Sequence, residues 1–359
     1  MSWFLAIAGF CVLIVLHEAG HFAAAKAVGM RVERFALFFP PLLFKVRRGE
    51  TEYGIGAIPL GGYVRITGMN PNEEVPPEVA HRSYYRQPVW KRVVVIAAGP
   101  LVNVLLAFVI IWGLFVFKGQ SEPTTEVAVI NKGEPAAQVL RLGDRIVAVD
   151  GKQGDAATLR EAIGSHTCKG TPKDGCKATT PAKITILRDG RAQVVEAYPR
   201  YNAAVERTLL GFQFDTHYVT VPPGEAVGDS VTGMWRITTG TVSAIARIFY
   251  DSEARKEVSG VVGSTKVVQQ SFQEDQIVQA ITLLAIISLS LAIVNLFPFL
   301  PLDGGHIFWA VAEKVRGRAI PFRVMEQASV VGFVLVIMLF AIGLTNDIDR
   351  LRGEGFQLR

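Results

Sequence analysis

The sequence predicts a membrane protein with about four transmembrane helices, a membrane-associated β-hairpin region on the cytoplasmic side and an inserted external β domain. Half of the 359 residues are hydrophobic and only 19% are charged, a balance that favours a chain lying largely in lipid. Four apolar runs approach the length of about 20 residues that a helix needs to cross a bilayer. A long segment between the second and third runs instead alternates short β-like stretches with turn residues.

The apolar runs give the predicted transmembrane helices, and the basic residues give their orientation. We place the helices at residues 1–30, 93–117, 277–302 and 328–345. Lys and Arg cluster in the segments that join the first helix to the second and the third to the fourth, so the positive-inside rule puts both segments in the cytoplasm. The two termini, including the tail 346–359, and the long middle segment then lie outside. The net charge of +5 reflects these flanking clusters, and we expect no nucleic-acid partner.

Residues 31–92 are predicted to form a β-hairpin and loop region at the cytoplasmic surface. The apolar stretch 35–46 is broken by Pro40-Pro41, so it predicts two short strands rather than a helix. Further strands are expected on both sides of the turn from Pro59 to Gly62. Two uses of this region remain open: it either braces the first helix or offers a sheet edge to which a substrate adds as a strand.

The middle segment is predicted to contain one folded β domain followed by a linker. Residues 118–202 carry the short strands, with hairpin turns at the Asp-Gly pairs 150–151 and 189–190. Residues 203–276 are less β-like and include an amphipathic helix at about 235–249, near the membrane surface.

Cys168 and Cys176 flank a polar loop of the predicted external domain. Outside the cytoplasm such a pair favours a disulfide bond. A zinc-binding pair is disfavoured because the spacing is longer than the usual C-x₂₋₄-C half-site. The third cysteine, Cys11, lies in the first predicted helix and is expected to serve packing alone.

The most informative motif is His17-Glu18-Ala19-Gly20-His21, near the end of the first apolar run. On a helix the two histidines share one face and can bind one Zn²⁺, with Glu18 as a general base. Glu and His inside a membrane-length apolar run are expensive and need a partner or a function. A structural histidine pair is the alternative, but six histidines in 359 residues make a chance match rare, so we expect a metal site.

A third ligand must come from elsewhere, because a catalytic zinc takes three protein ligands and keeps one position open. Pro298 and Pro301 break the third predicted helix just before Asp303-Gly304-Gly305. The first and third helices both reach the cytoplasm there, so Asp303 is expected at the depth of the histidine pair and is the preferred ligand. His306 is the competing ligand. Residues 303–327 are expected to be a cytoplasmic loop.

Asn103 lies within the second apolar run. An amide in hydrocarbon needs a hydrogen-bond partner. Its side chain either reaches toward the metal site or a substrate backbone, or makes an ordinary interhelical hydrogen bond.

These motifs resemble those of the site-2 protease family of intramembrane zinc proteases. The stretch His17 to His21 matches the HExxH signature of that family. Asn295 to Gly305 resembles its NxxPxPxxDGG signature, with the second proline displaced by one position to Pro301. The glycine-rich stretch Gly54 to Val64 and the Gly99-Pro100-x-x-Asn103 motif also recur there.

The external domain resembles a PDZ domain through the stretch from Leu140 to Ile146. The resemblance points to the bacterial regulator-of-sigma-E protease type, whose members cut anti-sigma factors in envelope-stress signalling. It implies a bacterial inner-membrane protein with a periplasmic PDZ-like domain and a zinc site toward the cytoplasm. A peptide groove of that domain is expected at Leu142, Gly143, Asp144 and Ile146.

The resemblance also implies an activity. The family hydrolyses a peptide bond within a single-span membrane protein, here an anti-sigma factor that has already been cut outside the membrane. One Zn²⁺ per chain is expected on His17, His21 and Asp303, with Glu18 as the general base. The candidates for binding the substrate backbone or the oxyanion are Asn295, Asn103, Gly61 and Gly62.

Two other classes of function stay open. One is a catalytically inactive scaffold of the same fold that binds membrane partners through its PDZ-like domain; the intact HExxH motif and Asp303 argue against it. The other is a transporter that uses zinc as cargo or cofactor, and four spans without an evident helix repeat argue against that class.

Overall fold

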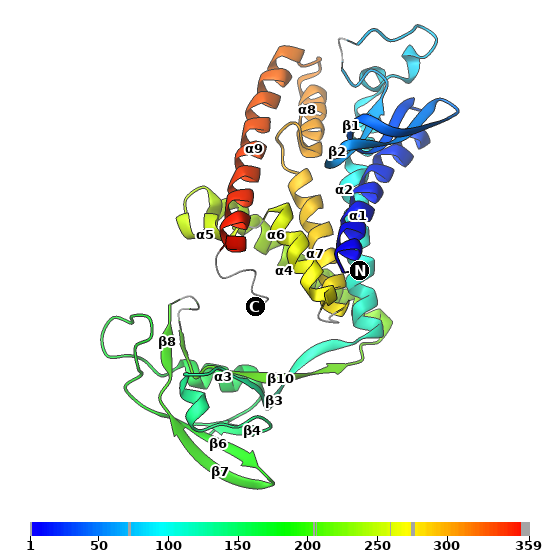
Figure 1. Cartoon of the computed structure of the whole chain (residues 1–359). Coiled ribbons are helices and arrows are strands. Elements are labelled where there is room, and N and C mark those ends of the chain that lie inside the picture. Colours follow the sequence, from blue (N-terminus) through cyan, green and yellow to red (C-terminus); the bar gives the residue numbers. More distant parts are fainter. Residues whose placement is uncertain are drawn as a thin grey trace. The chain divides into compact units, whose positions relative to one another are not determined.

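The computed structural model describes residues 2–70, 73–203, 205, 207–258, 260–273 and 277–352, and its chain divides into two compact units. The first unit, which we call the helical unit, comprises Met1–Phe115 and Pro222–Arg359. The second, the β unit, comprises Val116–Val221. Figure 1 traces both units along the chain.

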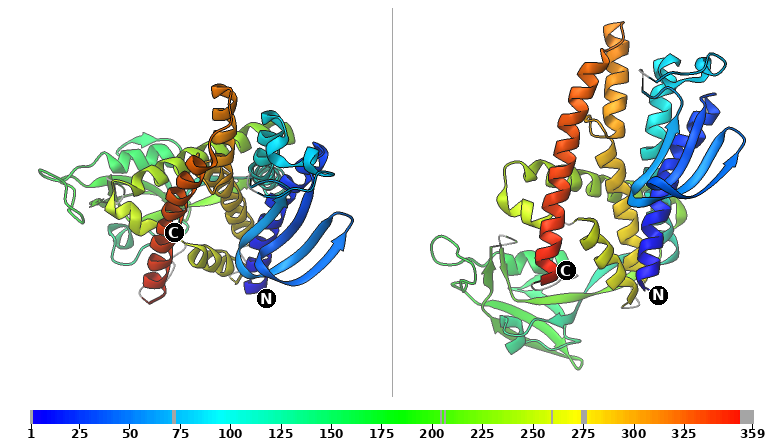
Figure 2. Two further views of the ribbon diagram at one scale, coloured as in Figure 1. Left: turned by 90° about the horizontal axis from the view of Figure 1, so that it is seen from above. Right: turned by 45° about the horizontal axis from the view of Figure 1, so that its top comes forward.

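As predicted, the described residues contain four helices long and apolar enough to cross a membrane. They are α1 (Ser2–Ala27), α2 (Val89–Phe117), α7 (Ile277–Asn295) and α9 (Phe322–Arg352). Within the helical unit, α7 lies beside α1 and is also contacted by α4 (Pro223–Ile248) and α6 (Val261–Gln273). An apolar cluster joins α2 to α4 and α7, and α9 contacts α5 and α6; Figure 2 shows these helices from two directions.

Helix ends depart from the prediction around the third and fourth spans. The third span was predicted to continue to residue 302, but α7 ends at Asn295 because the prolines that follow cannot continue a helix. The predicted loop 303–327 is wrong over its first part, which forms α8 (Asp303–Arg316) and ends at Gly317 in the left-handed conformation. Helix α9 continues past the predicted span into the first part of the predicted tail and ends at Arg352. Residues 353–359 lie outside the described part of the chain.

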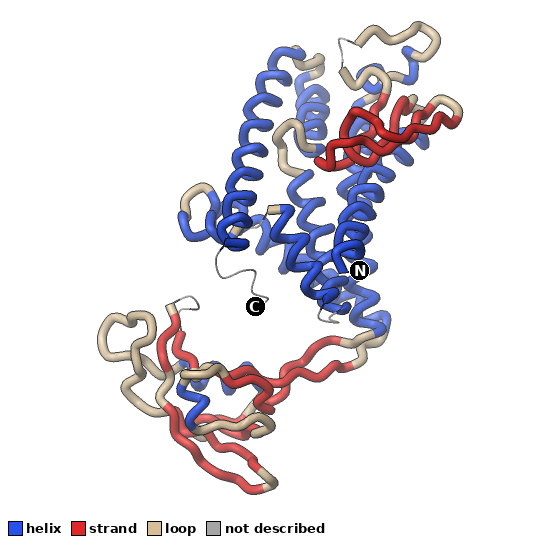
Figure 3. Tube along the Cα trace, in the orientation of Figure 1, coloured by secondary structure: helices blue, strands red, loops and turns tan. Residues whose placement is uncertain are grey.

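The cytoplasmic-side region predicted from the sequence forms a hairpin of two long bent strands, β1 (Val32–Arg48) and β2 (Thr51–Ile66), which packs on α1 (Figure 3). Phe35 lies opposite both Tyr53 and Val64, so the first part of β1 has a stretch of β2 on each side. The expected division at Pro40-Pro41 is present within β1. Residues 34–37 and residues 44–47 both pair with residues 52–55 but run in opposite directions along them, so the chain reverses at the prolines although β1 is continuous.

Two short 3₁₀ helices, η1 (Ala80–Arg82) and η2 (Tyr84–Arg86), lead from the hairpin into α2. An ion-pair network holds this connection against the hairpin turn. Arg82 donates two hydrogen bonds to the carboxylate of Glu50, 2.7 and 2.8 Å long, and Lys26 at the end of α1 pairs with the same carboxylate. The network fixes the hairpin to the end of the first transmembrane helix.

The β unit has a sheet with the strand order β10-β3-β4-β6-β7, and β5 pairs with β4. Its elements are β3 (Gln120–Ile130), η3 (Pro135–Gln138), β4 (Arg145–Val149), β5 (Lys152–Gln153), α3 (Ala156–Gly164), β6 (Ala182–Arg188), β7 (Arg191–Ala197), β8 (Arg200–Asn202), β9 (Arg207–Leu209) and β10 (Phe212–Val219). Both Asp-Gly turns have positive φ at their two residues, as hairpin turns of this type require. One apolar core lies between the sheet and α3.

The predicted boundary at residue 202 is too early. Strand β10 pairs with β3 along most of its length, so the β unit closes only after it, at Val221. Pairing between strands so distant in sequence cannot be read from local patterns. The remaining linker is helical: α4 begins well before the predicted residue 235, and α5 (Ser252–Glu257) and α6 follow. Residues 274–276 lie outside the described part.

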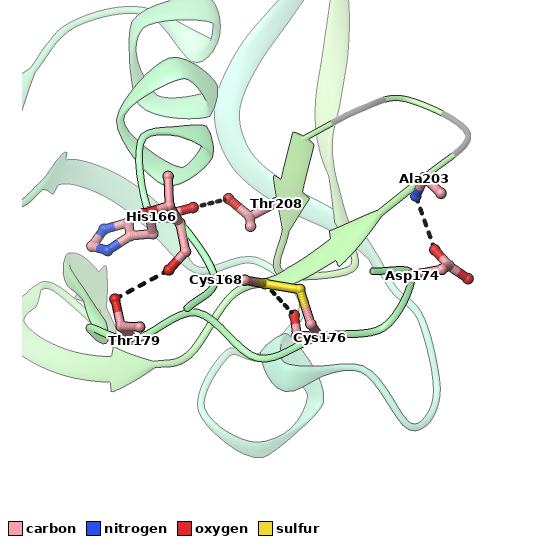
Figure 4. The surroundings of a disulfide bond; sticks show 8 residues. His166, Cys168, Asp174, Cys176, Thr179, Ala203 and Thr208 are labelled. Carbon is pink, nitrogen blue, oxygen red and sulfur yellow. Dashed lines mark hydrogen bonds between the residues drawn. A yellow bond between two sulfur atoms is a disulfide. The ribbon is translucent and has the colours of Figure 1, made fainter. Parts of the chain in front are cut away.

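Cys168 and Cys176 are joined by a disulfide bond in the loop between α3 and β6 (Figure 4). The loop is also held by hydrogen bonds around the bridge. Thr208 donates to the carbonyl of His166 at 2.7 Å, and the Ala203 amide donates to Asp174 at 2.9 Å. Cys11 is half-buried in α1 and free.

Glu50→Gln should destabilise the hairpin, with a defined pH dependence. Hydrogen bonds from Arg82 and the charge of Lys26 lower the pKa of Glu50 to about 2. Because the folded pKa lies below the unfolded value of ~4.3, the stabilisation is complete above ~4.3 and is lost as the pH falls toward 2. Glu50, Arg82 and Lys26 are each about one-third exposed. We therefore expect Glu50→Gln to lower the free energy of unfolding by roughly 1 kcal/mol at pH 7.

Hydrogen exchange of β2 amides at pH 7 and at pH 3 measures this effect. The matched control is Glu78→Gln, whose carboxylate is exposed and should leave exchange unchanged. Equal effects of Glu50→Gln at both pH values would contradict the assignment.

Candidate metal centre and active site

Three side chains from two helices converge within the helical unit. His17 and His21 lie in α1, and Asp303 is the first residue of α8. The Nε2 atoms of the histidines are 3.3 Å apart, and the Oδ2 atom of Asp303 lies 3.2 and 3.3 Å from them. Among the described residues these form one group of three potential metal ligands. Both histidines are buried, with 7% of their surface exposed.

The donor set fits a zinc ion. Nitrogen and oxygen ligands about 2.0–2.1 Å from a tetrahedral Zn²⁺ lie about 3.3 Å from each other, which matches all three edges of this triangle. Oδ2 of Asp303 is buried and has no hydrogen-bond partner among the described residues, despite the two nearby nitrogens. Three electron-rich atoms facing one another without a cation would be costly in so buried a site. The residues present therefore suit a metal with one further position left open.

Two glycines allow α1 and α2 to approach closely enough for this arrangement. A Cβ atom on Gly99 would lie 2.3 Å from Nε2 of His21, and one on Gly20 would lie 2.5 Å from the carbonyl oxygen of Ala98. Small residues serve the same purpose in other membrane helix pairs. The Nδ1 atom of His21 lies 2.9 Å from the carbonyl oxygen of Val95, which can only accept, so Nδ1–H donates and Nε2 keeps its lone pair.

Asp303 is positioned by the turn that precedes it and by an ion pair. A Cβ atom on Gly304 would lie 2.2 Å from the carbonyl oxygen of Leu296, so the chain folds back tightly at the start of α8. Further along α8, Glu313 accepts two hydrogen bonds from the buried guanidinium of Arg92 in α2, 2.7 and 3.0 Å long. Bidentate pairs of this kind fix geometry as well as energy. The helix that carries Asp303 is thereby tied to the helix that packs on the histidines.

Glu18 is half-buried on α1 between the two histidines, and the hairpin lies directly over it. A Cβ atom on Gly62 would lie 2.6 Å from Cγ of Glu18. Gly61, its neighbour, has a φ of 134°, a conformation that favours glycine. The structure therefore brings the predicted substrate-binding glycines to the predicted general base.

Of the two asparagines singled out from the sequence, the structure brings one to the metal centre. Asn103 in α2 is fully buried, and its Nδ2 atom lies 3.3 Å from Nδ1 of His17. Asn295 ends α7 and is half-buried, and no hydrogen bond links its side chain to another described residue. His306, the competing ligand, lines a cavity of about 320 Å³ with Met69 and Tyr85 and is not a member of the three-ligand group.

The predicted peptide groove of the external domain needs correction. Ile146 is 1% exposed and belongs to the core of the β unit, because the alternation along β4 turns it inward. Asp144 is buried and paired with Arg188 at 2.6 Å, and this hydrogen bond lowers its pKa. Both side chains therefore serve the fold of the domain. Leu142 is exposed, and Gly143 beside it occupies a turn with positive φ.

Sequence reasoning missed two supports of the site. The Arg92–Glu313 pair and the Val95 carbonyl carry no local signal, since each depends on which helix lies opposite. The Gly99-Pro100-x-x-Asn103 motif is visible in the sequence, but the space that Gly99 leaves for the imidazole of His21 follows only from helix packing.

A bundle of membrane-length helices with two histidines, a glutamate and an aspartate at one point has the architecture of an intramembrane metalloprotease. Residues 5–339 match Peptidase family M50, and the chain belongs to this family, the site-2 protease family of zinc-dependent metalloproteases. This confirms the predicted dependence on zinc and the prediction that the protein is a metalloprotease.

Relatives match over nearly their whole length. Zinc metalloprotease Rip1 of Mycolicibacterium smegmatis is 31% identical over 371 residues, which cover 90% of this chain and 88% of the relative. Zinc metalloprotease Rip1 of Mycobacterium bovis is 30% identical over 396 residues, covering 93% and 94%. A relative from Rhizobium meliloti is 29% identical over 368 residues, covering 95% and 94%.

Gly99→Ala should weaken zinc binding although it replaces no metal ligand. The added methyl group must displace the imidazole of His21 or separate α1 from α2, so we expect zinc affinity to fall by at least about tenfold. Titration of the purified protein with a competing chelator measures this loss. Gly240→Ala in α4, where a Cβ atom meets nothing within 4 Å, is the matched control and should bind zinc normally. Unchanged affinity in Gly99→Ala would show that the close helix contact does not shape the site.

Proposed function

We propose that this protein is an intramembrane zinc endopeptidase of the site-2 type, which cleaves the transmembrane segment of single-span proteins. The observation that carries the proposal is that Asp303 converges with His17 and His21, which flank Glu18 on a helix apolar enough to lie in the bilayer. Ionisable groups at such a depth mark a function by default.

The proposed roles follow from the chemistry of each side chain. His17, His21 and Asp303 hold the zinc ion. When bound, zinc polarises the scissile carbonyl group and acidifies water. Glu18 accepts a proton from the attacking water as its oxygen bonds to the carbonyl carbon, and later donates a proton to the nitrogen as the C–N bond breaks.

The hairpin is proposed to present the substrate. A transmembrane helix must unwind before its peptide bond is exposed, and the freed N–H and C=O groups then need partners inside the membrane region. The edge of β2 around Gly61 and Gly62 adjoins Glu18, so a substrate strand paired there would lie next to the general base. Of the remaining candidates, Asn295 is proposed to bind the substrate backbone, close to the turn that carries Asp303.

The physiological setting is proposed from the family resemblance and the β unit. We assign the protein to the bacterial inner membrane, with the β unit as a periplasmic PDZ-like domain and the zinc site toward the cytoplasm. The proposed substrate is an anti-sigma factor already cut outside the membrane, in envelope-stress signalling. The disulfide bond between Cys168 and Cys176 supports the placement of this domain in an oxidising compartment.

Substitutions should separate metal binding from chemistry. Glu18→Gln is expected to abolish cleavage and to keep one Zn²⁺, because Glu18 is not a ligand. His17→Ala, His21→Ala and Asp303→Ala should each lose zinc and activity together. The measurements are the metal content of the purified protein and the cleavage of co-expressed, tagged single-span proteins.

His306→Ala is the control for the choice of third ligand and should retain zinc. Loss of zinc in His306→Ala with full retention in Asp303→Ala would reverse that choice. Cleavage that continues in Glu18→Gln would remove the glutamate from the mechanism.

The proposed orientation is open to a direct test with the two bridged cysteines. In spheroplasts of a Cys11→Ser variant, a membrane-impermeant maleimide should label Cys168 and Cys176 only after reduction. The physical reason is that a disulfide leaves no thiol to react, while an external loop is open to both reagents. Labelling that also requires permeabilising the membrane would invert the topology, and labelling without reductant would show free thiols.

A further inference from the structure

Each zinc-site histidine has a second ring nitrogen that faces α2. His21 directs Nδ1 to the carbonyl oxygen of Val95, and His17 directs Nδ1 to the side-chain amide of Asn103. Val95, Gly99 and Asn103 are spaced by four residues and so share one face of α2. This face supplies an acceptor for His21, open space for its ring, and the amide for His17.

The orientation of the Asn103 amide decides which nitrogen of His17 carries a hydrogen. In the structure, Nδ2 of Asn103 lies 3.3 Å from Nδ1 of His17. Because Nδ2 can only donate, Nδ1 would have to accept, and the hydrogen of the neutral ring would then lie on Nε2. That hydrogen would point toward Nε2 of His21 and Oδ2 of Asp303, although Nε2 of His17 needs its lone pair to bind the metal. The drawn orientation is therefore incompatible with a metal ligand at Nε2.

Rotating the amide by a half-turn exchanges its oxygen and nitrogen with almost no change of shape, and the two atoms are assigned from their surroundings. The exchange turns Oδ1, which has no partner as drawn, toward Nδ1–H of His17. One amide atom lacks a partner in either orientation, so burial does not decide between the two orientations. The hydrogen that His17 must carry on Nδ1 decides in favour of the rotated amide.

We propose that Asn103 is a positioning residue for the zinc site: its Oδ1 atom accepts a hydrogen bond from Nδ1–H of His17. The bond keeps Nε2 of His17 as a lone-pair donor and fixes the angle of the ring, as the carbonyl of Val95 does for His21. This proposal rests on the proposed function, in which His17 is a zinc ligand. Outer-shell acceptors of this kind typically contribute about 10–100-fold to metal affinity.

The backbone of Asn103 makes a separate contact with α7 that does not involve the side-chain amide. Ser288 in α7, fully buried, donates a hydrogen bond of 3.0 Å to the carbonyl oxygen of Asn103. This contact joins α2 to the third transmembrane helix, and it involves none of the atoms that face His17. Ser288→Ala therefore removes a hydrogen bond to Asn103 without changing its amide, and it serves as the matched control.

The test compares zinc affinities of the full-length protein by chelator competition. Asn103→Leu, similar in shape but without an acceptor, should lower the affinity by about 10–100-fold. Asn103→Asp keeps an oxygen acceptor and should bind zinc at least as tightly as the wild type. Ser288→Ala should bind zinc normally. Thermal unfolding of the metal-free proteins shows whether each variant is folded.

A folded Asn103→Asp variant that loses as much affinity as Asn103→Leu would overturn the proposal, because an amide donor would then be what matters. Full affinity in Asn103→Leu would overturn it as well. If His17→Ala binds zinc like the wild type, the zinc site itself is wrong.

A second measurement needs no folded Asn103 variant. In ¹⁵N-histidine-labelled wild-type protein loaded with zinc, the His17 signal, identified by its loss in His17→Ala, should show a protonated Nδ1 whose hydrogen exchanges slowly. A metal-bound or rapidly exchanging Nδ1 would contradict the hydrogen bond to Asn103.

Discussion

The structure depends on one constraint: polar groups buried in an apolar helix bundle are costly unless an oppositely charged group, a hydrogen-bond partner or a metal ion meets them. His17, His21 and Asp303 each offer an atom to the same point, where one metal ion would meet all three. Their convergence requires α1, α2 and the start of α8 to lie unusually close. The glycines at 99 and 304 make that closeness possible, because a methyl group at either position would overlap its neighbour.

The remaining supports lie around this centre and act on the helices that carry the ligands. The buried guanidinium of Arg92 holds α8 through Glu313, and removing one partner of such a pair typically costs about 3–5 kcal/mol. On the other side, the network around Glu50 holds the β1–β2 hairpin to the end of α1. The hairpin in turn sets Gly62 against Glu18. Ligands, base and sheet edge are thus fixed by contacts between elements distant in sequence.

Much of the fold could be predicted because its signals are local. Four apolar runs gave the four candidate membrane helices, and strand alternation with Asp-Gly turns gave β4, β6 and β7. The errors arose where pairing or packing decides. Strand β10 completes a sheet begun by β3, and α8 begins where a loop was expected. Ile146 was assigned to a groove from a motif, although its inward position in β4 makes it a core residue.

The sequence by itself determined the chemistry: a histidine pair at helical spacing with a glutamate between them, and an aspartate after a helix-breaking turn. These depend only on covalent order and on the period of a helix. The sequence favoured Asp303 over His306 as the third ligand, but only the tertiary structure brings Asp303 to the histidines and turns Asn103 toward His17. Both outcomes depend on which faces of α1, α2 and α8 meet, and this is set by close packing and buried hydrogen bonds across the bundle, which no single stretch of sequence contains.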